Sequence, residues 1–137
     1  MSERRALVVD DEPRMLDIVK YFLEQGGWAV EAFSGGEKAL EAAGKRPFDV
    51  AILDIVLDGD SGYEVAGRLK KVEKAGDLPV LFMSSKVEMA KLFLESYDGR
   101  AEFLLKPFKK EDLLEAVGKL AAGGGRLAHT PTRARNK

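Results

Sequence analysis

Short apolar segments alternate with segments of helical periodicity along this chain, and the alternation repeats five times. The apolar run that ends at Asp54 is continuous, as expected of a strand covered on both faces of a parallel sheet. Strict alternation at these lengths indicates parallel strands joined by right-handed crossovers. We predict strands over 6–9, 28–33, 50–53, 79–83 and 101–105. We predict helices over 13–25 and 87–97, a helix that ends at Gly44, a helix around 65–72, and a last helix after Pro107.

Five such strands predict an α/β fold, a doubly wound (βα)5 flavodoxin-like sandwich with strand order 2-1-3-4-5. Pro13 suits the first turn of the first helix, because its missing N–H is not needed there. The segment Ser34-Gly35-Gly36-Glu37 has the form of a capping box and predicts the start of the second helix. In a sheet of this order, ligands bind at the carboxyl ends of the strands, beside the switch point between strands one and three.

The composition fits one ordinary domain of 137 residues, with 45% apolar and 33% charged residues. No apolar run approaches the roughly 18 residues that a membrane span needs, so we expect no membrane segment. The chain has no cysteine, which excludes disulfides and thiolate chemistry. We expect a cytoplasmic protein.

Charge divides the chain into two parts. Residues 123–137 hold four basic residues and no acid, which leaves 18 basic against 23 acidic residues in 1–122, a net charge of −5. The last part begins with three glycines and has too little apolar content to form a core. We therefore predict a folded domain over 1–122 and a disordered basic tail over 123–137.

Polar side chains follow the predicted strands at one edge of the sheet. Asp10 and Asp11 follow the first strand, and Asp54 follows the third. Ser84 follows the fourth strand and Lys106 the fifth. Each of these residues alone is more often a helix cap or a surface group than a ligand. Together they predict a site at this edge, because neighbouring parallel strands bring their ends together.

Three carboxylates in one place repel one another, and burial raises the cost of ionising them. A hard divalent cation such as Mg²⁺ relieves the repulsion and prefers oxygen ligands. A cation, a lysine and a hydroxyl suit the negative oxygens of a phosphoryl group. A carboxylate can also act as the nucleophile and become an aspartyl phosphate, and Asp54 is the best candidate because it is single and central.

This set of residues resembles the receiver domain of two-component response regulators, of the chemotaxis-receiver type, over about residues 4–122. The resemblance lies in the motifs that follow the strands, in their order and in their spacing. They are Asp10-Asp11, Asp54, the loop Asp58-Gly59-Asp60-Ser61-Gly62, Ser84 and Lys106-Pro107-Phe108.

The resemblance implies a role for each position. Asp10, Asp11, Asp54 and the backbone carbonyl of Val56 would hold Mg²⁺. Asp54 would accept phosphate from a sensor histidine kinase or a phosphotransfer protein. Ser84 and Lys106 would bind the attached phosphate, and the Lys106–Pro107 peptide bond would be cis. Ser84 and Phe103 would form the switch, with Phe103 turning inward when the hydroxyl moves to the phosphate.

Two positions near the site bear on how fast the phosphate is removed. In the family, the side chain at the position of Val56 helps or hinders the water that removes the phosphate, and valine cannot hydrogen-bond to that water. Lys86 is the other such position. We therefore predict slow self-dephosphorylation.

The predicted helix over 87–97 carries more apolar residues than one face can bury, among them Met89 and Phe93. The resemblance implies a protein–protein output surface on the fourth helix, fifth strand and fifth helix. We expect a stand-alone switch with no DNA-binding domain, whose partners are a downstream protein effector and, as a further candidate, a second copy of the chain. It would catalyse only its own phosphoryl transfer and dephosphorylation, and is not otherwise an enzyme.

Alternatives remain open at this point. One is a receiver-like interaction scaffold that is never phosphorylated, although the intact set of five positions argues against it. A phosphatase is disfavoured, because the chain lacks the lid that such an enzyme needs. A flavodoxin-like cofactor carrier is disfavoured because no phosphate-cradling loop follows the first strand.

Overall fold

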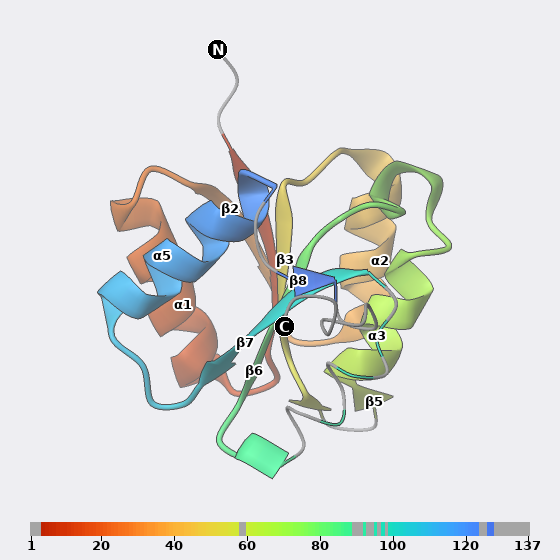
Figure 1. Ribbon diagram of the computed structural model, residues 1–137. Coiled ribbons are helices and arrows are strands. Elements are labelled where there is room, and N and C mark those ends of the chain that lie inside the picture. The colour runs from red at the N-terminus through yellow and green to blue at the C-terminus, as the bar shows by residue number, and fades with distance from the viewer. Residues whose placement is uncertain are drawn as a thin grey trace.

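The computed structural model describes residues 4–57, 60–88, 92, 95, 97, 99–123 and 126–127. Its centre is a parallel sheet with helices on both faces (Figure 1). None of the helices in these ranges is both long enough and apolar enough to cross a membrane.

The five predicted strands are present and run parallel. They are β1 (Arg5–Val9), β2 (Ala29–Phe33), β3 (Val50–Asp54), β6 (Val80–Ser84) and β7 (Arg100–Leu105). Their order in the sheet is β2-β1-β3-β6-β7, which confirms the predicted order 2-1-3-4-5. Every residue of β3 and of β6 is buried, because both strands are central and covered on both faces.

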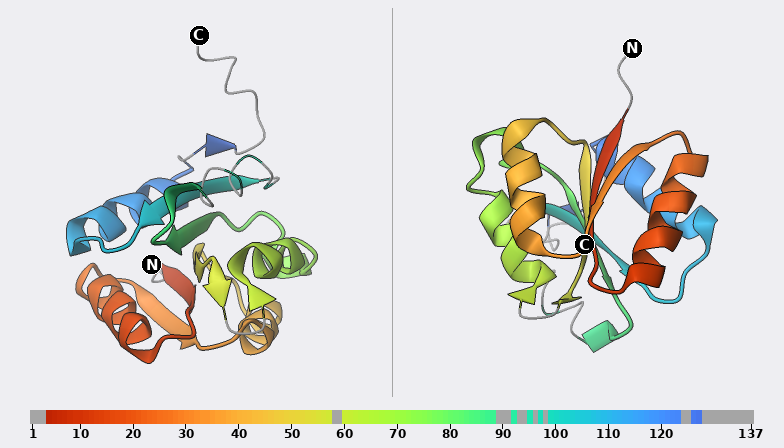
Figure 2. Two further views of the ribbon diagram at one scale, coloured as in Figure 1. Left: turned by 90° about the horizontal axis from the view of Figure 1, so that it is seen from below. Right: turned by 180° about the vertical axis from the view of Figure 1, so that it is seen from behind.

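Four helices whose bounds lie fully within the described residues cover the two faces of the sheet. Helices α1 (Pro13–Gln25) and α5 (Lys110–Ala121) pack on one face, and α2 (Gly36–Lys45) and α3 (Gly62–Leu69) on the other, with the short 3₁₀ helix η1 (Glu73–Ala75) after α3 (Figures 1 and 2). The apolar residues of each helix recur at helical spacing and face the sheet: α1 buries Val19 and Leu23, and α5 buries Leu113, Val117 and Leu120.

The start of α2 differs from the predicted capping box. Its N-cap is Gly35, and no side chain caps the helix there. Ser34 lies one residue too early, because the helix begins at Gly36. A side-chain cap is present instead at α3, where the hydroxyl of Ser61 accepts a hydrogen bond of 3.1 Å from the backbone N–H of Glu64.

Two short pairings extend the predicted topology. Strands β4 (Val56–Leu57) and β5 (Asp60–Ser61) form an antiparallel hairpin where we predicted a loop, although Asp58 and Gly59 of that motif lie outside the described residues. Strand β8 (Arg126–Leu127) pairs antiparallel with β7 (Figure 1). No strand was predicted in this segment, because its composition carries no strand pattern.

Only part of the predicted helix over 87–97 can be assessed. Val87, Glu88, Leu92 and Glu95 are helical, while Met89 and Phe93 lie outside the described residues. Tyr97 is buried, and its ring meets the ring of Phe82 edge to face at a centroid distance of 5.5 Å. Tyr97 thus packs into the part of the core that lies between the sheet and α3.

Candidate functional site

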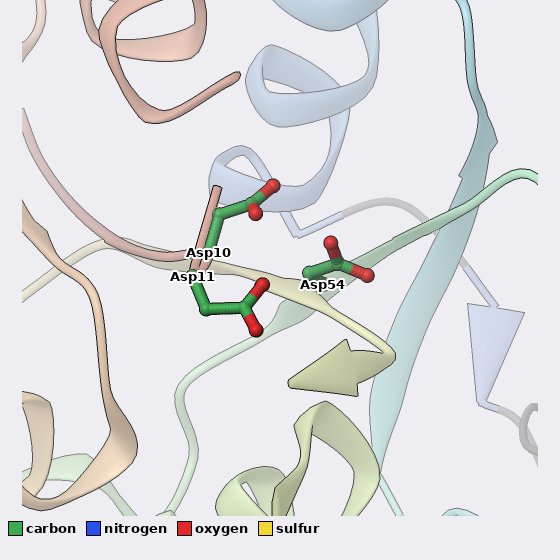
Figure 3. A group of neighbouring side chains, drawn as sticks. All are labelled: Asp10, Asp11 and Asp54. Carbon is green, nitrogen blue, oxygen red and sulfur yellow. The ribbon is translucent and has the colours of Figure 1, made fainter. Parts of the chain in front are cut away.

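Three carboxylates meet at the carboxyl ends of β1 and β3. Asp10 and Asp11 follow β1 directly, and Asp54 is the last residue of β3. The two strands are neighbours, with Val9 opposite Leu53, so their ends coincide. Each aspartate offers an oxygen within 4.8 Å of the oxygens offered by the other two (Figure 3). In the part of the chain that the structure describes, this is the only cluster of three or more such ligands.

Backbone amides hold two of these carboxylates in place. The N–H of Glu12 donates to Oδ1 of Asp10 at 2.9 Å, and the N–H of Val56 donates to Oδ1 of Asp54 at 3.0 Å. Asp10 is fully buried and Asp54 almost so. The two carboxylates are therefore fixed before any ligand binds, which lowers the ordering cost of binding one.

Lys106 places a cation between them. Its Nζ lies 2.7 Å from Oδ2 of Asp54 and 3.3 Å from Oδ2 of Asp10. The backbone N–H of Lys106 donates to the carbonyl of Ser84 at 2.8 Å, which ties the end of β7 to β6. The Lys106–Pro107 peptide bond is cis, as the family resemblance implies.

The electrostatics of the site follow from burial and proximity. The pKa of Asp10 is raised from 3.8 to about 6, chiefly by burial. The amide of Glu12 and the ammonium of Lys106 lower it, and the charge of Asp54 raises it. For Lys106, burial alone would lower the pKa. The hydrogen bond with Asp54 and the charges of Asp10 and Asp54 outweigh burial, so that its pKa is raised.

The remaining predicted positions surround this centre. Ser84 ends β6 and is buried, and its hydroxyl accepts a hydrogen bond of 3.0 Å from the N–H of Lys86. Phe103 lies opposite Phe82 in β7 and is half-buried against the core on the α2 and α3 face. The side chain of Val56 is 57% exposed. The roles assigned to these residues stay predictions.

Gly62 supports the site in a way that we did not predict. It begins α3 and its N–H donates to the carbonyl of Ile55 at 2.9 Å. A Cβ at this position would lie 2.1 Å from the backbone carbonyl oxygen of Asp54. The signal available in the sequence is the glycine that closes the loop motif after Asp54, but a glycine in a loop normally indicates a turn rather than a close contact.

Gly62→Ala is therefore expected to lower the free energy of unfolding by about 1–3 kcal/mol, because backbone must move to admit the methyl group. Gly67 is the matched control, since it lies in the same helix and a Cβ there meets nothing within 4 Å. Gly67→Ala should stabilise the protein by about 0.5–1 kcal/mol through helix propensity. Urea denaturation of both variants measures the difference, and equal stabilities would refute the contact.

The fold and the site together define a doubly wound α/β domain with an acidic, lysine-containing site at the switch point of its sheet. The chain belongs to the response regulator receiver domain family, whose model matches residues 6–118.

Relatives of known sequence include the transcriptional regulatory protein CreB of Escherichia coli, which is 34% identical over 85% of this chain and 50% of its own length. The DNA-binding dual master transcriptional regulator RpaA of Synechocystis is 31% identical over 82% of this chain and 47% of its own length. The chain thus spans about half the length of the curated relatives it matches.

The matches to solved structures of this fold extend over almost the whole of the solved chains. The chemotaxis protein CheY4 of Vibrio cholerae matches with a TM-score of 0.81 at 26% identity, over 87% of this chain and 99% of that one. The response regulator TrrA of Thermotoga maritima, solved in complex with Mg²⁺ and a beryllium fluoride, matches with a TM-score of 0.74 at 34% identity, over 85% and 98%.

Proposed function

We propose that this chain is a phosphorylation-dependent signalling switch that accepts a phosphoryl group on Asp54. The observation that carries the proposal is the cluster of Asp10, Asp11 and Asp54 oxygens within 4.8 Å, with the ammonium of Lys106 2.7 Å from Asp54. The donor would be the phosphohistidine of a sensor histidine kinase or a phosphotransfer protein. The family and the TrrA complex with Mg²⁺ and a beryllium fluoride support this assignment.

The donor set fits Mg²⁺. Its three carboxylates are hard oxygen ligands, and two of them are already held by backbone amides. Asp10, Asp11, Asp54 and the carbonyl of Val56 would hold the ion, which supplies positive charge to the phosphoryl oxygens when it is bound.

The chain's own residues would divide the remaining work. An oxygen of Asp54 attacks phosphorus, the phosphorus–nitrogen bond of the donor breaks, and the electron pair stays on the histidine nitrogen. Lys106, which already pairs with Oδ2 of Asp54, is placed to pair with a phosphoryl oxygen, and the hydroxyl of Ser84 would donate to another. The added negative charge would then favour the conformation in which the Ser84 hydroxyl moves to the phosphate and Phe103 turns inward.

Incubation with acetyl phosphate and Mg²⁺, followed by intact mass spectrometry, tests the proposal. We expect the wild type to gain one phosphoryl group and Asp54→Asn to gain none, while Asp17→Asn, a charge-matched change on the exposed part of α1, behaves as wild type. An unmodified wild-type mass would instead support the alternative, a receiver-like scaffold that is not phosphorylated.

Dephosphorylation should be slow, because the exposed side chain of Val56 offers no hydrogen bond to an attacking water. We expect Val56→Asn to speed loss of the phosphoryl group about tenfold, equivalent to lowering the barrier by about 1.4 kcal/mol. The decay of the phosphorylated mass after removal of the donor measures the rate. Ile18→Asn, which changes an exposed residue of α1, should leave it unchanged. A wild-type half-life of seconds would contradict the prediction.

Output would pass through a protein partner on the surface formed by the segment that precedes β7, β7 itself and α5. Val87 is 46% exposed and Leu92 62% exposed on this side. The partner would be a downstream effector or a second copy of the chain, in the cytoplasm. The two relatives named above are transcriptional regulators, and this chain spans about half of their length.

The surface can be tested once a phosphorylation-dependent partner is isolated. Leu92→Asp should weaken its binding by about 1.5–3 kcal/mol, the scale of burying one leucine side chain. Titration calorimetry measures the change. Ile18→Asp serves as the control on α1, and a larger loss for that variant would place the interface on α1 instead.

A further inference from the structure

The C-terminal segment adds a strand to the edge of the sheet at a particular point. Leu127 of β8 lies opposite Arg100 of β7, and Arg126 lies opposite Ala101. Because the pairing is antiparallel, β8 runs toward the start of β7 (Figure 1). Leu127 therefore lies at the end of the sheet opposite Asp54.

A groove lies at this end of the sheet. One cavity of about 330 Å³ is lined by residues around η1 and the start of β6 and β7, and a second of about 280 Å³ adjoins it. The two share Gly76, Asp77, Leu78 and Arg100. Arg100 is also the residue that pairs with Leu127, so β8 ends at the rim of the groove.

The acidic groups of the groove are available to a cation. Asp49, Glu73 and Asp77 line the larger cavity, and all three are exposed. Asp49 accepts a hydrogen bond of 2.8 Å from the backbone N–H of Arg5. Within the described ranges, the carboxylates of Glu73 and Asp77 have no ion-pair partner.

The basic groups of the groove are directed to other partners. Nζ of Lys74 donates to the carbonyl of Lys45 at 3.3 Å, and Nη1 of Arg100 donates to the carbonyl of Leu120 at 2.8 Å. Nζ of Lys70 lies 5.3 Å from the centre of the Tyr97 ring. The groove thus keeps acidic groups that its own cations do not neutralise.

We propose that the basic segment 128–137 is an intramolecular ligand of this groove. It holds Arg133, Arg135 and Lys137 and no acid, and at about 3.3 Å per residue it can span the groove from Leu127. Tethering by β8 gives it an effective concentration on the order of millimolar, so that pairs too weak to form between separate molecules form here. This role does not depend on phosphoryl transfer at Asp54.

Paramagnetic relaxation enhancement in the full chain tests the proposal. The chain has no cysteine, so Asn136→Cys gives one site for a nitroxide label. We expect the label to broaden the backbone amides of residues 73–78 and to leave those of residues 10–12 sharp. Raising the ionic strength from about 0.01 to about 1 M shortens the Debye length from about 30 to about 3 Å and should remove the broadening.

Neutral variants separate docking from chance proximity. Glu73→Gln combined with Asp77→Asn should abolish most of the broadening, whereas Glu37→Gln combined with Glu41→Gln, on exposed positions of α2, should leave it intact. A mixture of isotope-labelled protein without nitroxide and nitroxide-labelled protein without isotope detects only contacts between molecules. This mixture should show no broadening. Broadening spread evenly over the surface, broadening at other residues, or broadening in the mixed sample would overturn the proposal.

Discussion

Asp10→Asn is expected to abolish the stabilisation of this protein by Mg²⁺ and, at the same time, to stabilise the metal-free protein at neutral pH. Asp10 is fully buried among like charges, which raises its pKa from 3.8 to about 6. The unfolded chain ionises this carboxyl at lower pH than the folded chain does. The folded state therefore bears a cost at neutral pH that disappears on acidification.

The pH dependence has a definite sign. Below about pH 4 the carboxyl is protonated in both states and contributes nothing. As pH rises from about 4 to about 6 the folded state holds the extra proton, so stability falls, by up to about 3 kcal/mol at 1.36 kcal/mol per unit of pKa. Above pH 6 the full cost persists until a cation binds. Stabilisation by Mg²⁺ should accordingly grow as pH rises through 6.

Asparagine removes the charge but keeps the oxygen that accepts from Glu12. It also loses the pairing of Asp10 with Lys106, at 3.3 Å. We therefore expect a net gain for the metal-free variant of about 1–2 kcal/mol at pH 7.5, or roughly 4–8 °C in melting temperature for a domain of this size, and no gain at pH 4.5. Thermal unfolding with and without Mg²⁺ at the two pH values measures both effects.

Asp11→Asn is the matched control. It removes a charge from the same cluster but from the more exposed aspartate, so it should lose the Mg²⁺ response without stabilising the metal-free protein. If Asp10→Asn destabilised the metal-free protein at pH 7.5, or kept a wild-type response to Mg²⁺, the electrostatic account of the cluster would be wrong.

Lys106→Met is expected to have the opposite effect on the metal-free protein. Its ammonium group is the cation that faces both Asp10 and Asp54, and its side chain is only 15% exposed. Breaking a largely buried ion pair leaves the carboxylates uncompensated and costs about 3–5 kcal/mol. Asp10 can take up a proton in response, so we expect a loss of about 2–4 kcal/mol at pH 7.5.

Mg²⁺ should rescue this variant more than it stabilises the wild type, because lysine and the metal compete for the same carboxylates. Chemical denaturation with and without Mg²⁺ measures the rescue. Lys38→Met, at an exposed position of α2, should leave stability and the response to Mg²⁺ unchanged. A loss of stability in Lys106→Met that Mg²⁺ does not restore would indicate that the lysine acts only through packing.

The parallel sheet and the acidic cluster could be predicted from the sequence because each follows from a local pattern. The apolar runs predict the strands, and the acidic residues directly follow the runs that become neighbouring strands. A continuous apolar run such as 50–53 fits a central strand, and strict alternation with helices indicates parallel strands with right-handed crossovers. Five such strands fit the doubly wound order 2-1-3-4-5. Once β1 and β3 are neighbours, Asp10, Asp11 and Asp54 meet without further information.

The features that were not predicted depend on contacts between distant segments. The β4–β5 hairpin and β8 are two-residue pairings, too short to leave a pattern in the sequence. The capping box at Ser34 was wrong because the chain places the helix start one residue later, with Gly35 as the cap. The contact between Gly62 and the backbone of Asp54 likewise depends on how α3 packs on β3.

Trapping the phosphorylated residue tests the central claim most directly. Hydride reduction converts an aspartyl phosphate to the corresponding alcohol with loss of phosphate, and peptide mass spectrometry then locates the changed residue. After incubation with acetyl phosphate, we expect the change at Asp54 alone, and only when Mg²⁺ is present. A change at any other residue, or equal labelling of Asp54 without Mg²⁺, would contradict the account.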